Sequence, residues 1–444
     1  MNRSLLLAGM LTLGPLGPAV AEGWSSAERQ GIELLRGLRD PSAPAPPESG
    51  MALAALGPQT VELLLEVLEE RSVPGVEDGD EAQLLSQPQR ETILVALEDL
   101  GRSAVLPLLD ARLEVAQAES PVSRSRRAMG IAALGAVARP GELKRLVELA
   151  RDPELGGFES ALGPELEDAV ERATLRDTDG FAVLADLARD LDPSAAEFVL
   201  QGVGATGDAR GVEVLAQLAS GSPRLQNLVA AQVPLLGPSL EPSWNRELAG
   251  ALQGGLSSDS RNLCAASAMA LGELEDFTAV PELIGLLDSE DAGLRSAAHR
   301  GLTRLLNRPA SPSVGAWRHW LRVETTWLER EAPRLFSQSR GEDVAVAVAA
   351  LEELGRHRLE RHRLSLEVGL ALAHDSASVR RAACLALTGL GSRWAAQDLH
   401  LALGDPDPSV AMAAAEVLAV VTGEPRGADP AAWDDYEFPD PNAY

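Results

Sequence analysis

Residues 270–283 read ALGELEDFTAVPEL, which is an Ala/Leu-rich segment, a short turn with Glu and Asp, and the start of a second segment. Related stretches occur at 96–109, 133–146 and 202–215. Within the second segments the apolar positions recur every three to four residues, as a single stripe on a helix requires. Each stretch therefore predicts two helices joined by a short turn.

The predicted helix pairs recur at a nearly constant spacing. Most steps are about 35 residues, and a weaker unit around Arg172 fills the one long gap. The Leu or Val before each turn stands at Leu97, Leu134, Val203, Leu236, Leu271, Leu305, Leu351 and Leu387. A fixed period indicates a stacked repeat protein, in which each unit buries its apolar face against its neighbours. The predicted fold is an all-α, α-α superhelix, a solenoid of about eleven helical hairpins.

A longer duplication overlies this period. Residues 259–320 align with residues 375–436 at a constant shift of 116 residues and without a gap. The alignment pairs Asp291 with Asp407, and it also pairs Pro309 with Pro425. The shift corresponds to three units, and the sequence predicts that the module at 259–320 is present a second time at 375–436.

The module includes an insertion at 307–336. We expect Ser313 to cap a helix that carries several tryptophans on one side. Trp317 and Trp320 then either fill a groove between units or form an open aromatic surface that binds a partner. The shift pairs these two residues with Trp433 and Tyr436.

The C-terminal tail, 423–444, is therefore predicted to repeat the role of the insertion. Asp429 followed by Pro430 is typical of a helix start, with the Asp as the cap and the Pro at the first helical position. We expect a short helix there that closes the last unit.

The pattern of the repeats resembles the HEAT family, and more closely the short HEAT-like units of the phycobilisome-lyase type. Their consensus is close to A-L-G-x-L-G-D-x-R-A-V-P-x-L, and the matching residues are Gly204, Asp208, Arg210, Val212, Ala270, Leu271, Gly272, Asp276, Val280, Pro281 and Leu283. The resemblance covers roughly 50–425 and rests on turn and core positions, so it concerns the fold rather than the chemistry. It implies a solenoid that binds another protein through the second helices of its units.

The N-terminus has the layout of a secretory signal peptide. A basic start precedes the apolar run at 5–13, and Ala19-Val20-Ala21 fits a cleavage site, so we expect the mature chain to begin at Glu22. The expected divisions are a signal peptide (1–21), N-terminal helices (22–90), HEAT-like repeats (91–306), the insertion (307–336), further repeats (337–422) and the capping tail (423–444). Within 22–90 we expect a Pro-rich loop at 41–50 and an acidic loop at 72–89.

Composition narrows the possible partners. The formal net charge is −27, and such an acidic surface repels the phosphate backbone, so nucleic acid is not expected as a partner. No segment approaches the roughly 20 consecutive apolar residues that a membrane-spanning helix needs. The sequence thus predicts an exported protein that is periplasmic or extracellular, monomeric and without an integral membrane span.

One stretch is rich in basic residues although the chain is acidic. It comprises Arg356, His357, Arg358, Arg361, His362 and Arg363. One interpretation is a solvated helix face whose cations pair with nearby glutamates. The other is a docking site for an acidic partner, strengthened as histidine becomes protonated.

Motifs for catalysis or cofactors are weak. Gly202–Gly207 spells G-x-G-x-x-G, but an Ala/Leu-rich helix precedes it where a strand is required. His357 and His362 stand five residues apart, so on a helix their rings would not share a metal. Cys264 and Cys384 fall in separate units, too far apart for a disulfide. We therefore expect no catalytic, cofactor-binding or metal-binding residues.

These observations favour an exported, non-catalytic HEAT-repeat scaffold that binds another protein. Two alternatives stay open at this point. One is an enzyme similar to the chromophore lyases, because the resemblance includes repeats of the phycobilisome-lyase type. The other is a structural component of the cell envelope without a discrete ligand.

Overall fold

The computed structural model describes parts of 25–34 and then residues 46–70, 87–115, 121–150, 163–176, 179–191, 193–219, 221–238, 242–307 and 313–439. The predicted signal peptide, 1–21, lies outside these residues. Within them the regular structure is helical throughout, which confirms the all-α prediction. Contacts divide the chain into two units, Met1–Leu218 and Ala219–Tyr444.

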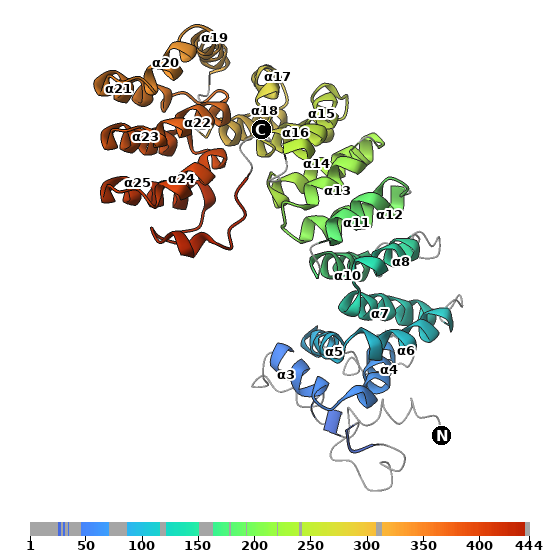
Figure 1. Ribbon diagram of the computed structural model, residues 1–444. Helices are drawn as coiled ribbons and strands as arrows, with labels where there is room; N and C mark the ends of the chain where they lie inside the picture. The colour runs from blue at the N-terminus through green and yellow to red at the C-terminus, as the bar shows by residue number, and fades with distance from the viewer. Residues whose placement is uncertain are drawn as a thin grey trace. The chain divides into compact units, whose positions relative to one another are not determined.

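The first unit is a series of helices that pack in consecutive pairs (Figure 1). Among the first helices of the pairs, α5 packs on α7, α7 on α10 and α10 on α12. The weaker repeat predicted around Arg172 is α10. The helices of this unit are α3 (Pro46–Ala54), the turn η1 (Pro58–Thr60), α4 (Val61–Glu70), α5 (Gln87–Leu100), α6 (Arg102–Val115), α7 (Pro121–Val137), α8 (Pro140–Ala150), α10 (Gly163–Leu175), α11 (Gly180–Ala188), α12 (Pro193–Ala205) and α13 (Gly211–Leu218).

Two loop predictions in this unit need correction at their ends. The predicted Pro-rich loop 41–50 is helical from Pro46 onward, because proline is well tolerated in the first turn of a helix. The predicted acidic loop 72–89 ends earlier, because α5 begins at Gln87. Residues 71–86 lie outside the described part of the chain. The G-x-G-x-x-G stretch forms the end of α12 and the turn that follows, as expected for an inter-helix connection.

The second unit continues the helix pairs and contains both copies of the module. Its first helices stack in the orders α14, α16, α18 and α21, α23, α25. Its elements are α14 (Pro223–Leu236), α15 (Pro242–Gln253), η3 (Gly254–Ser257), α16 (Arg261–Glu273), η4 (Phe277–Ala279), α17 (Val280–Leu286), α18 (Ala292–Leu306), α19 (Val314–Arg330), α20 (Ala332–Ser339), α21 (Val344–Leu354), α22 (Arg361–Gly369), η5 (Leu370–Ala373), α23 (Ala377–Leu390), η6 (Arg393–Ala395), α24 (Ala396–Ala402), α25 (Pro408–Thr422) and η7 (Pro430–Trp433).

The structure confirms the duplication element by element. The pairs η3/η5, α16/α23, η4/η6, α17/α24 and α18/α25 all begin 116 residues apart. Both α18 and α25 start at an Asp whose carboxylate accepts a backbone N–H of the first turn. They end at equivalent residues with left-handed backbone, Asn307 (φ 44°) and Gly423 (φ 77°). The same local sequence signals therefore set the same boundaries twice.

The closing elements of the two modules are equivalent but unequal in length. The Oγ of Ser313 accepts the Ala316 N–H at 3.3 Å and caps α19, as predicted. The carboxylate of Asp429 accepts the Ala431 N–H at 3.1 Å and caps η7, which packs on α24 as α19 packs on α17. The predicted closing helix of the tail is thus present, as a single 3₁₀ turn.

The aromatic residues of these elements are repeated as well. Trp317 and Trp433 are only 2% and 1% exposed, so they fill the interior. Each makes an edge-to-face contact with its neighbour, Trp320 at 5.4 Å and Tyr436 at 5.5 Å between ring centroids. The hypothesis of an open aromatic surface is therefore wrong for Trp317. Trp320 is half-buried and packs against the Trp317 ring.

Candidate functional site

The predicted basic cluster spans the turn between α21 and α22. Its first three members, Arg356, His357 and Arg358, lie in the turn, and the other three form the first turn of α22. Glu360, the residue before α22, has left-handed backbone with φ 53°. Because the chain reverses within this short stretch, the cluster divides into buried and exposed members rather than forming one face.

Arg361 and His362 are buried, with 4% and 2% exposure. The Arg361 Nη1 donates to the Gly391 carbonyl oxygen at 2.6 Å, and its Nε donates to that of Leu305 at 3.3 Å. The His362 Nδ1 lies 2.8 Å from the Ser392 Oγ. The hypothesis that these two residues belong to an exposed docking surface is therefore wrong. Their polar groups form hydrogen bonds with other residues of the second unit.

Glu275 is the counterion of these two residues, and its sequence position did not predict this role. It follows α16 in left-handed backbone, pairs with the Arg361 guanidinium, and has its Oε2 2.7 Å from the His362 Nε2. Burial alone would raise the pKa of Glu275, but the adjacent His362 and Arg361 side chains outweigh it and hold the pKa well below its usual range. The carboxylate is thus ionised inside the protein.

Burial has the opposite consequence for the imidazole. It lowers the pKa of His362 below the ordinary value of 6.5, and the nearby charges of Arg361 and Arg393 act in the same direction, although Glu275 opposes them. Phe277 and Trp394 place their rings 5.3 and 6.5 Å from the imidazole and keep it in an aromatic environment. Glu275, Arg361 and His362 therefore form a buried polar cluster, here called the joint, which connects elements of the second unit and is not a surface for a partner.

His357 also has a structural role. Its ring stacks on that of Trp327 with 3.3 Å between the ring centroids, and its Nδ1 lies 3.0 Å from the buried carboxylate of Glu324. These contacts hold the turn after α21 against α19. His357 and His362 therefore have separate surroundings.

Arg356 and Arg363, two of the remaining arginines of the cluster, match the solvated-face interpretation. Exposed Arg356 donates to the Glu353 carboxylate at 2.8 Å, and exposed Arg363 donates to that of Glu360 at 3.0 Å. Arg358 donates to the Gly355 carbonyl oxygen at 3.1 Å. Binding of an acidic partner by Arg356, Arg358 and Arg363 stays a prediction.

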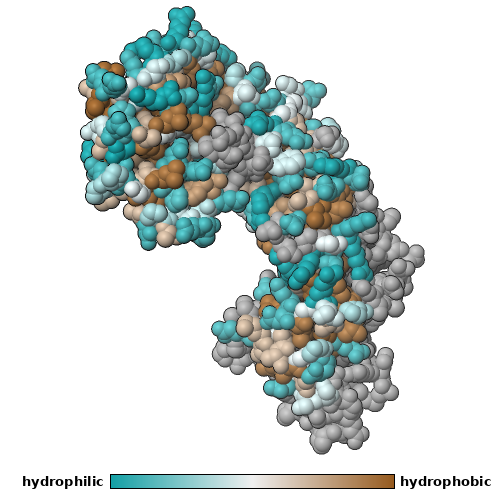
Figure 2. All heavy atoms as spheres, in the orientation of Figure 1, coloured by the Kyte–Doolittle hydropathy of each residue, from teal (hydrophilic) through white to brown (hydrophobic). Residues whose placement is uncertain are grey.

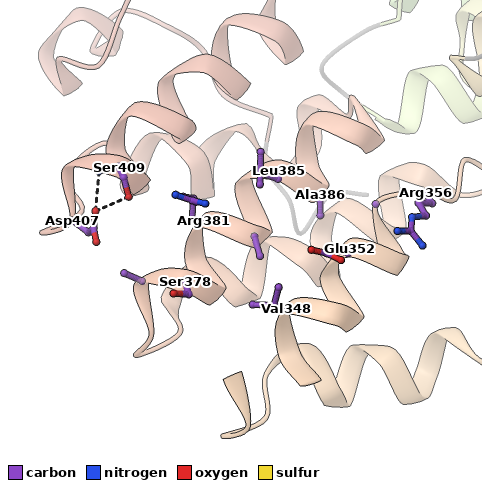
Figure 3. A pocket seen from close by; sticks show the side chains of 12 residues that line it. Val348, Glu352, Arg356, Ser378, Arg381, Leu385, Ala386, Asp407 and Ser409 are labelled. Atoms are coloured by element: carbon purple, nitrogen blue, oxygen red, sulfur yellow. Dashed lines mark hydrogen bonds between the residues drawn. The ribbon is translucent and has the colours of Figure 1, made fainter. Parts of the chain in front are cut away.

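A groove of about 580 Å³ lies across the first helices α21, α23 and α25 (Figure 3). Val348 and Glu352 come from α21, while Arg381 and Leu385 come from α23. At i and i+4 the two residues of each pair occupy one face of their helix. Hydrophobic residues are interspersed with hydrophilic ones on this part of the surface (Figure 2).

Two charged side chains of the groove have no hydrogen-bond or ion-pair partner within the described part of the chain, namely Arg381 and Glu352. Asp407, at the start of α25, accepts the Ser409 N–H at 2.9 Å and its hydroxyl at 2.7 Å, so that carboxylate has local partners. Leu385 lies beside Arg381 in Figure 3 and is 63% exposed. The groove therefore presents a cation, an anion and an apolar side chain to solvent.

A second groove, of about 500 Å³, lies between α17 and α19. Its arginines have partners, since Arg318 donates to Asp288 at 2.5 Å and Arg322 lies 3.1 Å from the His319 ring. This groove therefore offers fewer free charges than the one over α21, α23 and α25.

Potential metal ligands are not clustered among the described residues. Among them, no three His, Cys, Asp or Glu side chains converge as the ligands of a metal ion would. Cys264 and Cys384 are free and buried, as predicted, and burial raises the pKa of the Cys384 thiol to about 11. None of the helices in the described ranges combines the length and apolar character of a bilayer-spanning segment.

Comparison with known proteins identifies repeats in the C-terminal part. Residues 366–432 match the family model of HEAT repeats. No curated protein matches the chain. The match covers the end of α22 and the elements from η5 to η7, and it confirms for these residues the resemblance seen in the sequence.

Among solved structures, the chain is similar to three helical proteins at low identity. An engineered protein is 17% identical (95% of this chain and 99% of that one covered; TM-score 0.29). The complex of CpcE and CpcF of phycocyanin lyase from Nostoc sp. PCC7120 is 14% identical (62% and 94%; 0.27). Importin beta is 12% identical (95% and 58%; 0.35). Such distant likenesses say nothing about function. Residues 366–432 are thus identified as HEAT repeats.

Proposed function

We propose that this chain is an exported, non-catalytic scaffold that binds another protein. The observation that carries the proposal is the groove over α21, α23 and α25, where free charges surround an exposed leucine. Binding sites in proteins are typically concave and combine apolar side chains with a few polar or charged groups that provide specificity. HEAT repeats supply a rigid row of helices on which such a groove can be built.

The two copies of the module can be compared at the positions of these exposed groups. Arg381 and Leu385 of α23 correspond to Ala265 and Met269 of α16, and exposed Met412 of α25 corresponds to Ser296 of α18. The first copy folds into the same elements without the arginine and without an exposed methionine on α18. The fold therefore does not require these groups in the second copy, which supports a role in binding.

Export is part of the proposal and rests on the N-terminal sequence. The apolar run at 5–13 and the Ala19-Val20-Ala21 site support it. Sequencing of the mature N-terminus after cell fractionation tests it. Glu22 at the first position of protein from the periplasm or medium is the expected result, and a retained Met1 in the cytoplasm contradicts it.

Site-specific photocrosslinking in the native cell tests the binding function. A photoreactive amino acid at Leu385 should give a discrete crosslinked species that saturates with expression level. A control places the same amino acid at exposed Ser296 of α18, which does not line this groove and where we expect no such species. If neither position gives a saturable product, this groove does not bind a protein.

A further inference from the structure

We propose that the groove over α21, α23 and α25 binds a segment of the partner that carries an acidic, an apolar and a basic side chain in that order. The acidic group meets Arg381, the apolar group meets Leu385, and the basic group meets Glu352. This inference rests on the proposed function and specifies the chemistry of the partner at the same groove.

Arg381 is the first determinant. Its guanidinium is exposed and makes no ion pair in the described part of the chain, although Asp407 also lines the groove. Asp407 is the cap of α25 and accepts two hydrogen bonds from Ser409, so it is held in place at the helix start. A guanidinium in this situation can bind an incoming carboxylate through two parallel N–H···O bonds.

Leu385 is the second determinant. It stands one helical turn after Arg381 on α23, and half-buried Val348 of α21 lines the same groove. An apolar side chain placed there removes apolar surface of both partners from water, which favours association. Leu385 lies horizontally between Arg381 and Glu352 in the view of Figure 3, and all three residues line the same groove.

Glu352 is the third determinant. It lies one turn after Val348 on α21 and has no partner within the described residues, whereas its neighbour Glu353 pairs with Arg356 at 2.8 Å. Glu352 is thus available to a cation. Arg381 and Glu352 thus give the groove a free positive charge and a free negative charge at different places. Charge complementarity then fixes the direction in which a segment binds.

A selection from a library of short random peptides tests the proposal, with the full-length protein as bait. The wild type should enrich peptides with an acidic, an apolar and a basic position in order. Arg381→Glu should reduce the affinity of a selected peptide at least about tenfold, and Arg381→Glu with Glu352→Arg should prefer the reversed charge order. Arg300→Glu, which changes an exposed arginine of α18, is the matched control and should leave affinity unchanged.

Thermal unfolding of each variant checks that it is folded. The double variant retains the net charge of the wild type, so it remains informative if the single variant is unstable. Enriched peptides whose affinity is insensitive to both variants would overturn the charge order while a crosslink at Leu385 still upheld binding. If no peptide is enriched although Leu385 crosslinks to a partner, recognition by a short segment is wrong. Absence of both results would refute the proposed function itself.

Discussion

Glu275 and Gly391 occupy the same position in the two copies of the module, and Arg361 binds both of them. Both residues have left-handed backbone, with φ of 57° and 60°. Arg361 pairs with the carboxylate of Glu275 and donates to the carbonyl oxygen of Gly391 at 2.6 Å. One position therefore supplies a side chain in one copy and only the backbone in the other, and a single guanidinium joins the two copies.

This joint predicts a large effect of Glu275→Gln. Removal of one partner from a buried ion pair leaves the other charge uncompensated, and we expect a loss of about 3–5 kcal/mol in the free energy of unfolding. Denaturant titration followed by circular dichroism measures it. Arg261→Ala is the control, because Arg261 is 79% exposed in its pair with Asp291 and should contribute at most about 1 kcal/mol. Similar losses in the two variants would contradict the structural importance of the joint.

The joint also predicts that acid destabilises the protein. The folded-state pKa of His362 is lowered, so the unfolded chain binds the proton first and the free energy of unfolding falls as pH drops below about 6.5. The lowered pKa of Glu275 acts in the same direction below its ordinary value of 4.5.

Denaturant titrations at a series of pH values test this prediction. His362→Gln should flatten the dependence just below pH 6.5. The control is His299→Gln, which changes an exposed histidine and should leave that dependence as it is in the wild type. A wild type whose stability is constant from neutral pH to pH 5 would argue against the lowered pKa of His362.

Close packing between helices predicts opposite effects for two glycine substitutions. A Cβ at Gly272 of α16 would lie 2.6 Å from the Gly301 Cα of α18, so Gly272→Ala should cost about 1–3 kcal/mol. Gly250 lies within α15 with no atom within 4 Å of such a Cβ, and Gly250→Ala should stabilise by up to about 1 kcal/mol. Melting curves compare the two. A Gly272→Ala variant as stable as the wild type would mean that α16 and α18 separate easily.

The C-terminal tail is predicted to stabilise the second unit. Trp433 is buried and its Nε1 donates to the Gly427 carbonyl oxygen at 3.1 Å, so Trp433→Ala should cost about 3–5 kcal/mol. Deletion of 427–444 should lower the melting temperature for the same reason. Asp434→Asn, at an exposed position, serves as control. A tail deletion without effect would show that the last unit is stable without its aromatic closure.

The sequence was sufficient for features that depend on local signals. Ser313 and Asp429 were recognisable as caps, and the apolar period placed the helix pairs, because both signals act over one or two helical turns. The shift of 116 residues predicted that Trp433 is equivalent to Trp317, and the structure buries both side chains. Whether they are buried or exposed was left open by the sequence.

The joint and the groove could not be predicted in the same way. Glu275 and Arg361 are 86 residues apart, and no periodic signal connects them. The basic cluster was therefore treated as one surface, although burial divides it. One sequence signal pointed to Glu275. The alignment places it opposite Gly391, and a non-glycine residue is uncommon at a position with left-handed backbone. Arg381 and Leu385 become significant only when α21 lies beside them.

A stack of repeats ordinarily unravels from its ends, since each repeat touches only its neighbours. The second unit departs from that rule. Arg393 donates to the carbonyl oxygen of Pro238, 155 residues earlier, and Arg361 reaches back to Leu305. The last repeats are thus fastened to much earlier ones. We expect residues 221–439 to lose their structure in a single cooperative step, as a globular domain does.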